Sequence, residues 1–419
     1  MMLVKNDLPS LPIQKWMKRK STSEVIKALT RTGGEARFVG GCIRDTLAGK
    51  AEPQNIDIAT PIRPRDVQKL LTDYGLTQIP TGIEHGTITT VVDGEVFEIT
   101  TLRADLRTDG RHAIVEYTDD WEVDARRRDF TINSIYCDPD GSLFDPMGGV
   151  SDLKKNKIRF IGDPEKRISE DLLRILRYFR FKAVFNNIDT DSTALDACKK
   201  FAPYLKKISG ERIYSELLKL LASPDPIPSL TQCRDCKVID NLFGWAPSDA
   251  RLKSLKNLIK YEEECGDPDP IRRLVIFAQD NIELDKLTGR LKLPKTVETR
   301  LKRINNTPNL LSTSLKEHDC YKIIYKNGKQ FFIDNLLTDS ANFPESMPSN
   351  WVSLVQDAFA WVRPQCPISG EDVVALGIPE GPLVGQIVME AETWWIDNNF
   401  KTSRQETLDY LMTLTTRCS

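Results

Sequence analysis

The sequence of 419 residues lacks the features that mark zinc-stabilised or disulfide-bonded proteins. It has only three histidines, His85, His112 and His318, and its nine cysteines include a single Cys-x-x-Cys pair, Cys233 and Cys236. A zinc site or a disulfide framework would need a second close pair or neighbouring histidines. We therefore expect reduced, mostly buried thiols.

Long apolar runs are also missing. No stretch approaches the ~20 apolar residues that a membrane-spanning helix needs. The N-terminal stretch MMLVKNDLPSLPIQKWMKRK lacks the continuous apolar centre of a secretory signal. These absences predict a soluble, cytoplasmic protein with no membrane partner, and nothing in the sequence indicates an obligate protein partner.

Neither sign of charge dominates, since 58 lysines and arginines oppose 60 acidic residues for a net charge of −2. That balance excludes a uniformly basic protein that coats nucleic acid. Basic residues nevertheless gather at 15–20, 126–128, 154–159, 174–182, 199–207 and 300–303. One such cluster is typical of a solvated helix face, but their recurrence favours a partner that carries phosphate.

Hydrophobic periodicity divides the chain into two parts. Residues 36–160 alternate short β-rich runs, such as NIDIAT and EVFEITTLR, with turn signals. From about residue 165 the apolar spacing becomes helical, as in EDLLRILRYFRFKAVF, and proline clusters separate the helices. The pattern predicts an α+β protein, in which a mixed-sheet head precedes a long helical body.

The segment FVGGCIRD of the head suits a phosphate ligand. Gly40 and Gly41 follow a short apolar strand, and Arg44 lies about one turn into a helix. Backbone N–H groups and a guanidinium could therefore approach a triphosphate. A tight strand-to-helix turn would use the same glycines without any ligand.

Acidic side chains on two strands suit a metal ion. Asn55 and Asp57 point to the same face of one strand, and Glu98 lies on another. Oxygen ligands from neighbouring strands form the hard site that Mg²⁺ prefers, and such an ion can clamp the attacking and leaving oxygens in phosphoryl transfer. An isolated carboxylate at a strand edge would be merely solvated.

The segment EDLLR carries a hydrogen-bond acceptor and a donor three residues apart. In a continuous helix, Asp171 and Arg174 would share one exposed face. A carboxylate beside a guanidinium matches the amino group and ring nitrogen of cytosine and adenine, and opposes the carbonyl and N–H of uracil and guanine. An ordinary surface ion pair would show the same spacing.

These segments occur in a familiar order. FVGGCIRD, NIDIAT, GIEHGTITTV, FEITTLR, RRDFTINSIYCDPDG, DPMGGVSDL, IRFIGDPEKRISEDLLRILRYFRF and GERIYSELLKLL follow one another. Together they resemble the class II tRNA nucleotidyltransferases of bacterial type, the CCA-adding enzymes, whose relatives include poly(A) polymerases and enzymes that add only CC or A. The resemblance is strong over residues 24–225, and the less specific segment 368–395 is similar to the family's bacterial tails.

The resemblance implies a head like that of DNA polymerase beta at 24–155, a helical neck with a nucleotide-reading motif at 156–225, a body at 226–305 and a tRNA-binding tail at 306–419. It implies that CMP, CMP and AMP are added from CTP and ATP to the tRNA 3′ end, with Mg²⁺ as cofactor and release of pyrophosphate. The tRNA acceptor arm would lie on the helices. Poly(A) polymerase or partial addition remain alternatives within the family.

The resemblance also implies residue roles. Asp57 matches the second metal carboxylate, Asn55 stands where the family has its first metal-binding aspartate, and Glu98 is a third acidic candidate. The implied nucleotide-binding residues are Gly40, Gly41 and Arg44 for the primer end and triphosphate, Arg127, Arg128, Asp129 and Asn133 for the ribose, and Asp171, Arg174 and Arg177 in the nucleotide-reading motif.

Asn55 raises one competing hypothesis, a tRNA-binding relative without catalysis. An asparagine keeps one oxygen ligand but loses the charge, so a weakened metal site is expected. Either a natural asparagine or an aspartate replaced to trap a substrate complex would give this sequence. Residues 103–125, rich in charge and poor in apolar side chains, are expected to form the mobile loop that such enzymes use for AMP addition, or a plain surface connection.

Overall fold

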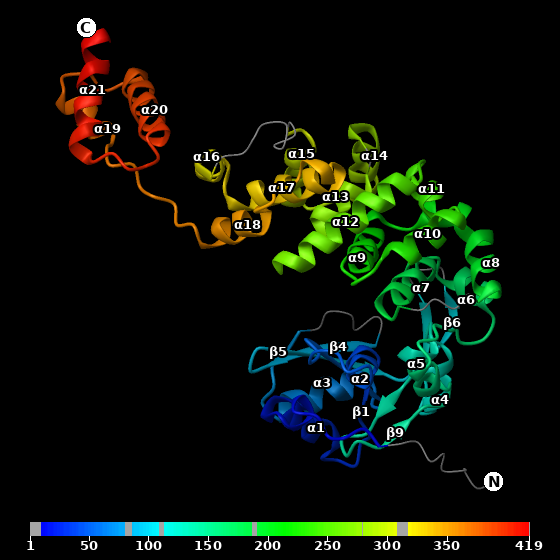
Figure 1. The fold of residues 1–419 in the computed structure, drawn as a ribbon. Coiled ribbons are helices and arrows are strands. Elements are labelled where there is room, and N and C mark those ends of the chain that lie inside the picture. The colour runs from blue at the N-terminus through cyan, green and yellow to red at the C-terminus, as the bar shows by residue number, and fades with distance from the viewer. Residues whose placement is uncertain are drawn as a thin grey trace, which may run out of the picture. The chain divides into compact units, whose positions relative to one another are not determined.

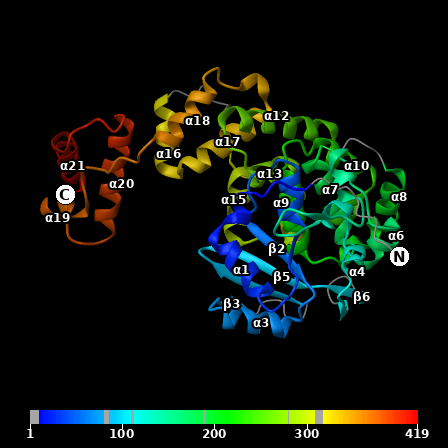
Figure 2. The same ribbon diagram turned by 90° about the horizontal axis from the view of Figure 1, so that it is seen from below.

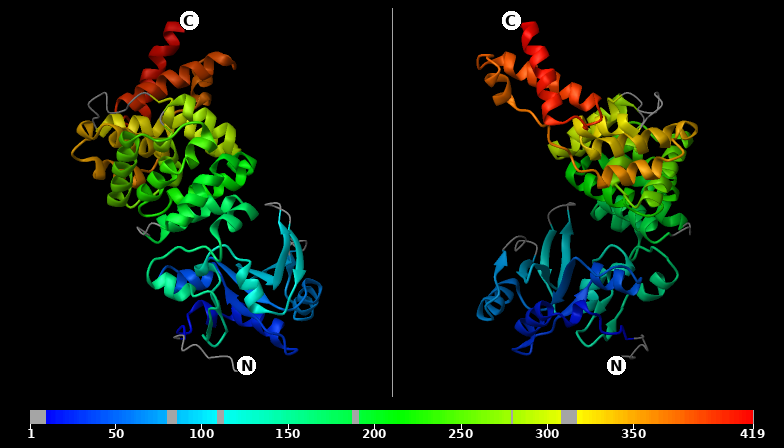
Figure 3. Two further views of the ribbon diagram at one scale, coloured as in Figure 1. Left: turned by 90° about the vertical axis from the view of Figure 1, so that its right-hand side faces the viewer. Right: turned by 60° about the vertical axis from the view of Figure 1, so that its left-hand side comes forward.

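The computed structural model describes residues 10–79, 86–108, 113–186, 191–278, 280–307 and 317–418. It separates into two compact units. Unit 1 comprises residues 1–247 and 285–293, and unit 2 comprises residues 248–284 and 294–419. The predicted α+β class is confirmed, because the strands lie in the N-terminal part of unit 1 and every regular element described after residue 144 is a helix (Figures 1 and 3).

A mixed sheet forms the head. Its strands run in the order β3-β4-β5-β2-β1-β8-β9, and only β2 and β5 are parallel neighbours. Their bounds are β1 Arg37–Val39, β2 Asn55–Thr60, β3 Gln78–Ile79, β4 Thr87–Val92, β5 Glu95–Thr101, β8 Tyr136–Cys137 and β9 Leu143–Phe144.

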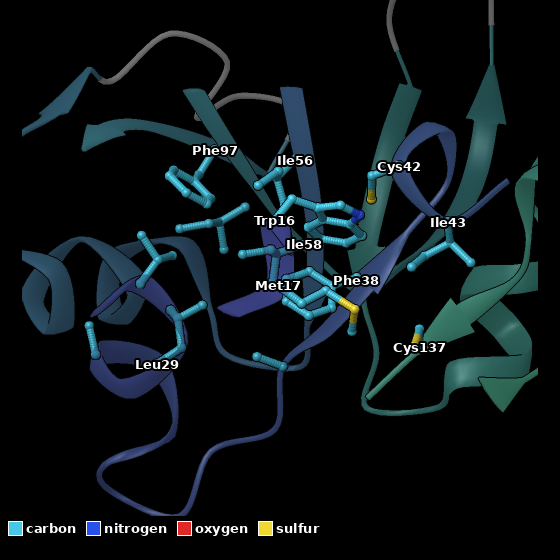
Figure 4. Packing of buried hydrophobic residues seen from close by; sticks show 14 of the residues in the cluster. Trp16, Met17, Leu29, Phe38, Cys42, Ile43, Ile56, Ile58, Phe97 and Cys137 are labelled. Atoms are coloured by element: carbon cyan, nitrogen blue, oxygen red, sulfur yellow. The ribbon is translucent and has the colours of Figure 1, made fainter. Parts of the chain in front are cut away.

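One face of this sheet is apolar because alternate strand residues are hydrophobic. Ile56 and Ile58 of β2 and Phe97 of β5 are buried there with Trp16 and Phe38 (Figure 4). The helices α1 (Lys20–Thr30) and α3 (Pro64–Asp73), whose ribbons are labelled in Figure 2, contribute buried residues to the same cluster. The side chains that alternate with this core, Asn55, Asp57 and Glu98, are thereby directed to the opposite face.

The segment 103–125 differs from the expected mobile loop. It contains a two-stranded sheet, β6 (Arg103–Thr108) with β7 (Ala113–Tyr117), and then α4 (Trp121–Arg126). Asp120 caps α4 by accepting hydrogen bonds from the backbone N–H groups of Glu122 and Val123. The loop prediction was wrong for these residues because cross-strand pairing and a helix cap do not require apolar side chains. Residues 109–112 lie outside the described residues.

The remaining helices of unit 1 follow the sheet. They are α2 Gly41–Leu47, α5 Gly149–Lys154, α6 Pro164–Glu170, α7 Leu173–Val184, α8 Ser192–Phe201, η4 Ala202–Lys207, α9 Gly210–Leu221, α10 Ile227–Asp235 and α11 Val238–Phe243, with the short 3₁₀ turns η1 Trp16–Lys18 and η3 Thr131–Asn133. Cys233 and Cys236 are buried in this part as free thiols.

Unit 2 is described as helical throughout. Its elements are α12 Asp249–Cys265, α13 Pro270–Phe277, the start of α14 Asn281–Leu291, α15 Lys295–Asn305, α16 Glu317–Asn327, α17 Lys329–Asn342, η6 Pro344–Ser346, α18 Trp351–Ala360, α19 Gly370–Ala375, α20 Pro382–Asp397 and α21 Arg404–Cys418. The last three helices share a small apolar cluster that includes Val373, Ile387 and Leu411 (Figure 1). Within the described ranges, no helix is long and apolar enough to cross a membrane.

Candidate active site

Two carboxylates meet on the polar face of the head sheet. Asp57 of β2 and Glu98 of β5 are register partners on parallel neighbouring strands, so their side chains project from the same face. Asn55 lies two residues before Asp57, opposite Val96, and is exposed at the start of β2. The structure therefore places all three side chains predicted for a metal clamp on one face of the sheet, with Asp57 and Glu98 as direct neighbours.

Asp57 is held in an electrostatically unfavourable place. Burial and the nearby charge of Glu98 raise the pKa of Asp57 to about 6. The positive charges of Arg128 and Arg44 and a hydrogen bond from the Gly41 backbone offset only part of this. A buried carboxylate beside a second carboxylate gains from a cation placed between them.

The turn between β1 and α2 lies against Asp57. Gly40 adopts φ 72° and ψ −127°, a conformation that side-chain-bearing residues rarely adopt. A Cβ atom on Gly40 would lie 3.3 Å from Asp57 Oδ2 and 3.8 Å from an Arg128 nitrogen. The glycine thus keeps space open beside the carboxylate, which supports the predicted close approach of a ligand to this turn.

Arg44 projects from α2 into a fixed position. Its Nη1 donates to Asn133 Oδ1 at 2.6 Å, and its Nη2 donates to Asp45 at 2.6 Å. The guanidinium carbon also lies 4.8 Å from the ring centroid of Phe181. Hydrogen bonds and a cation–π contact together restrict the rotamers of this long side chain.

Behind the site, Asp124 pairs with two predicted arginines. Arg127 Nε donates to Asp124 at 2.8 Å, and Arg128 Nη2 donates to it at 3.2 Å. The Tyr136 hydroxyl donates to the same carboxylate at 2.6 Å. Burial alone would raise the pKa of Asp124, but the two arginine charges and this hydroxyl outweigh it and lower the pKa to about 2. Neither Asp124 nor Tyr136 was among the residues predicted from the sequence.

A second network joins the head to α7. Asp129 accepts a hydrogen bond from Asn133 Nδ2 at 2.9 Å and one from Arg177 Nε at 2.6 Å. Burial opposes ionisation of Asp129, yet the charge of Arg177 and these hydrogen bonds hold its pKa well below the usual range. Arg177 also lies 3.6 Å from Glu216 of α9. The predicted residues Asp129, Asn133 and Arg177 therefore form one connected group.

Asp171 and Arg174 differ from the expected pair. The helix α6 ends at Glu170, Asp171 has an extended backbone, and α7 begins at Leu173. The two side chains consequently do not share one helical face, and that part of the prediction was wrong. The reason lies in the sequence, because the Asp171 carboxylate accepts a hydrogen bond from the Leu173 backbone N–H at 3.1 Å and so begins a new helix.

Each member of this predicted pair has another partner. Asp171 Oδ2 accepts from Arg212 Nη2 of α9 at 2.7 Å. Arg174 Nη1 donates to Glu170 Oε2 at 2.6 Å and to the Arg167 carbonyl at 2.7 Å. Sequence reasoning did not single out Arg212 or Glu170, although both lie in quoted motifs.

The residues that could hold a divalent cation are Asp57, Glu98 and the amide oxygen of Asn55. Across the described part of the chain, no group of three or more histidine, cysteine, aspartate or glutamate side chains has metal-binding geometry. Two carboxylates and an amide form a weaker hard-oxygen site than three carboxylates would. Because Glu98 raises the pKa of Asp57, the donor set still suits a cation.

Two protein-family models match parts of the chain. Residues 36–159 match the model described as the poly A polymerase head domain. Residues 187–248 match the model described as a probable RNA and SrmB-binding site of polymerase A. The first match contains the site carboxylates and the second begins beyond α7.

Whole-chain relatives extend this result. The mitochondrial CCA tRNA nucleotidyltransferase 1 of Mus musculus is 34% identical, over 98% of this chain and 94% of that protein. The CCA-adding enzyme of Levilactobacillus brevis is 31% identical, over 88% of this chain and 91% of that enzyme.

A crystal structure of the Bacillus stearothermophilus CCA-adding enzyme with CTP matches the fold. Its TM-score is 0.70 at 24% identity, over 95% of this chain and 98% of that one. Mammalian and bacterial proteins therefore both resemble the chain, and the predicted cytoplasmic location stays a prediction because the mouse relative is named mitochondrial.

Proposed function

The chain belongs to the family of CCA-adding tRNA nucleotidyltransferases, and we propose from this premise how its residues perform CCA addition. The enzyme adds CMP, CMP and AMP to the 3′ end of tRNA from CTP and ATP, without a nucleic-acid template. One observation carries the assignment of the chemistry to the head, namely the pairing of Asp57 with Glu98 beside the Gly40–Gly41 turn.

Each addition is a nucleotidyl transfer. The 3′-hydroxyl oxygen of the RNA attacks the α-phosphorus, a new P–O bond forms, and the bond to the β-phosphate oxygen breaks to release pyrophosphate. Little covalent chemistry is required of the protein, so catalysis depends on positioning and on stabilising negative charge. Mg²⁺, when bound by Asp57, Glu98 and the Asn55 amide oxygen, would supply charge to the attacking and leaving oxygens.

The remaining residues position the substrates. The Gly40–Gly41 turn leaves space for the triphosphate, and Arg44 offers a guanidinium that hydrogen bonds already orient. Arg127, Arg128, Asp129 and Asn133 are proposed to contact the ribose. Their buried networks support this role, because hydrogen-bonded side chains hold their geometry when a ligand binds.

Base selection is proposed for Asp171 and Arg174. Asp171 Oδ2 already accepts from Arg212 and Arg174 Nη1 already donates to Glu170, so a base that binds these same atoms exchanges with one protein partner at each. Such an exchange replaces one charge-assisted hydrogen bond by another and avoids leaving either group unpaired. A base with the wrong edge leaves both groups without their bonds, which is the basis of discrimination.

The four predicted domains are retained as a functional division. We assign nucleotide transfer to residues 24–155, base selection to the neck at 156–225, and tRNA binding to the body at 226–305 and the tail at 306–419. The basic segments of the helical region support phosphate contacts, so tRNA affinity should fall as salt rises.

The test uses three tRNA substrates that end before the CCA sequence, after its first C and after its second C. Each is incubated with one labelled nucleotide at a time. Incorporation of C, C and A in that order is expected. Repeated A addition to all three would indicate a poly(A) polymerase, and arrest after CC, or action only on CC, would indicate partial addition. An Asp57→Ala variant that binds tRNA but incorporates nothing is the control for the assigned site.

A further inference from the structure

A cavity of about 480 Å³ lies within unit 1, between the end of α6 and the start of α9. We call it the α6–α9 cavity. Its lining includes Asp171, Leu172, Phe201, Tyr204, Lys207 and Arg212. The volume falls in the range of about 300–1,000 Å³ that is usual for pockets that bind small molecules or single groups of larger ones.

The outer wall of the cavity is aromatic. Phe201 ends α8 and Tyr204 lies in η4, and their ring centroids are 6.2 Å apart. Tyr204 is 50% exposed, so one ring of the wall is accessible to a ligand. Exposed aromatic rings beside basic groups are the platforms on which unpaired nucleic-acid bases stack.

Positive charge surrounds these rings. Lys207 Nζ lies 5.4 Å from the Tyr204 ring centroid, and Lys200 Nζ lies 5.9 Å from that of Phe201. Lys199, Lys200, Lys206 and Lys207 are all exposed along α8 and η4. Lys200 is paired with Glu165 at 2.5 Å, so we assign the main ligand contact to Lys207. The charge continues beyond the cavity, which suits a chain of phosphates better than a single nucleotide.

The inner wall is polar. The ion pair between Asp171 and Arg212, at 2.7 Å, lies on this side, and Asp171 is itself one of the two residues proposed to select the base. The cavity residues from Phe201 to Arg212 also fall within the segment 187–248 that matches an RNA-binding family model. Aromatic, cationic and RNA-related features therefore coincide in one place.

We propose that the α6–α9 cavity binds an unpaired nucleotide of the RNA substrate, with its base stacked on Tyr204 and Phe201 and its phosphate facing Lys207. The proposal rests on the proposed function in taking tRNA as the substrate. It adds a binding site for the growing single-stranded end, separate from the carboxylates of the head.

The test compares two RNA hairpins that share one stem. The first carries a 3′ overhang of unpaired nucleotides and the second is blunt. Tyr204→Ala should weaken binding of the overhang hairpin by roughly fivefold to a hundredfold, because stacking on an aromatic side chain is worth ~1–3 kcal/mol per base. It should leave the blunt hairpin and CTP affinity unchanged. Tyr204→Phe keeps the ring and should bind the overhang as the parent does.

Tyr74→Ala serves as the matched control, because Tyr74 is also an exposed tyrosine of unit 1 and lies at the end of α3. Equal loss for both hairpins would overturn the proposal in favour of a duplex-binding surface. Loss of CTP affinity would overturn it in favour of a free-nucleotide site, and no loss for either hairpin would remove the cavity from RNA binding altogether. Failure of the parent protein to incorporate C and A would contradict the proposed function, while the hairpin comparison would still decide this site.

Discussion

Two groups of charged side chains, one in each unit, differ in how their charges are balanced. In unit 2, Arg272 is fully buried and contacts Glu262 at 3.0 Å, Asp267 at 2.8 Å and Asp334 at 3.1 Å. Arg273 reaches the second Glu262 oxygen at 2.6 Å. We call these five residues the Arg272 cluster. In unit 1, by contrast, Asp57 has another carboxylate, Glu98, as its register partner.

The difference separates a charge group that holds a fold together from one that is prepared for a ligand. In the Arg272 cluster, burial raises the pKa of Glu262 despite two arginines, but each Glu262 oxygen accepts an arginine N–H. Asp57 is subject to both burial and the repulsion of Glu98. Carboxylates with such strongly raised pKa values cluster at functional sites, where binding of a substrate or metal ion offsets the electrostatic repulsion. Four substitutions test this contrast.

The largest expected effect is a gain of activity when a negative charge is added at position 55. Asn55→Asp introduces a third carboxylate, and if the asparagine costs several kcal/mol of transition-state stabilisation, the rate should rise on the order of a hundredfold to ten-thousandfold at ~1.4 kcal/mol per decade. Single-turnover CMP addition across a Mg²⁺ titration measures it. The metal requirement should fall as well.

Gln54→Glu is the control for this substitution, because it adds the same charge one residue away on an exposed side chain. A similar gain in both variants would indicate general electrostatic attraction. An unchanged rate in Asn55→Asp would mean that Asp57 and Glu98 hold the metal without position 55.

This site also shows what the sequence could predict. The alternation in NIDIAT and EVFEITTLR was sufficient to place Asn55, Asp57 and Glu98 on one polar face, because strand periodicity fixes which side chains share a face. The pairing of β2 with β5, which makes Asp57 and Glu98 neighbours, depends on sheet order across some forty residues. No local pattern specifies that order.

The second prediction concerns the Arg272 cluster. Arg272→Ala leaves Glu262 and Asp334 buried without their shared partner, and breaking a buried ion pair in this way costs ~3–5 kcal/mol. Hydrogen exchange in α12 and α17 should report the loss, because these helices carry the two carboxylates. Nucleotide binding by unit 1 should be unaffected.

Arg404→Ala provides the matched control in the same unit. Arg404 is more than half exposed and pairs with Asp372 at 2.5 Å. Surface pairs of this kind contribute ~0–1 kcal/mol. If Arg272→Ala proves no more destabilising than Arg404→Ala, the Arg272 cluster is not a structural centre and the contrast with Asp57 fails.

The third prediction concerns Asp124, a buried carboxylate of unit 1 whose negative charge is balanced by Arg127 and Arg128. The pKa of Asp124 is lowered to about 2 from an ordinary value of 3.8. A depressed folded-state pKa stabilises the fold above the unfolded pKa, and this contribution is lost as pH falls from about 4 toward 2. The shift corresponds to about 2 kcal/mol.

The measurement compares the parent with Asp124→Asn across that pH range by hydrogen exchange in α4 and β8. The difference in free energy of unfolding between the parent and Asp124→Asn should shrink by about 2 kcal/mol as the pH falls. Asp66→Asn, at an exposed position of α3, is the control for removing a solvent-exposed carboxylate from unit 1. A pH-independent difference for Asp124→Asn would show that its ion pairs are not the source of its effect.

Asp124 also illustrates what the sequence could not predict. Its segment reads as charged and solvated, yet Asp124 is 1% exposed because Arg127, Arg128 and Tyr136 enclose it. A buried polar side chain is hydrogen-bonded, so its burial can be predicted only when its partners are known. The helix break at Asp171 was missed for a related reason, since a side chain that bonds its own backbone competes with helix continuation.

The smallest expected effect is on base choice. Asp171 supplies one of the two proposed contacts to the base, so Asp171→Ala should lose about half of the ~1–3 kcal/mol of a bidentate contact, a roughly threefold to tenfold drop in the preference for CTP and ATP over UTP and GTP. Unlike the Arg272 cluster, Asp171 lies on a cavity wall, where it pairs with Arg212 and accepts a hydrogen bond from the Leu173 backbone N–H. Its loss should therefore cost only the ~0.5–2 kcal/mol of a helix cap. Incorporation with competing nucleotides measures the preference, and Arg212→Lys, which keeps a cation beside Asp171, is the control. Parental selectivity in Asp171→Ala would remove Asp171 from base selection and leave it only its structural contacts with Arg212 and the start of α7.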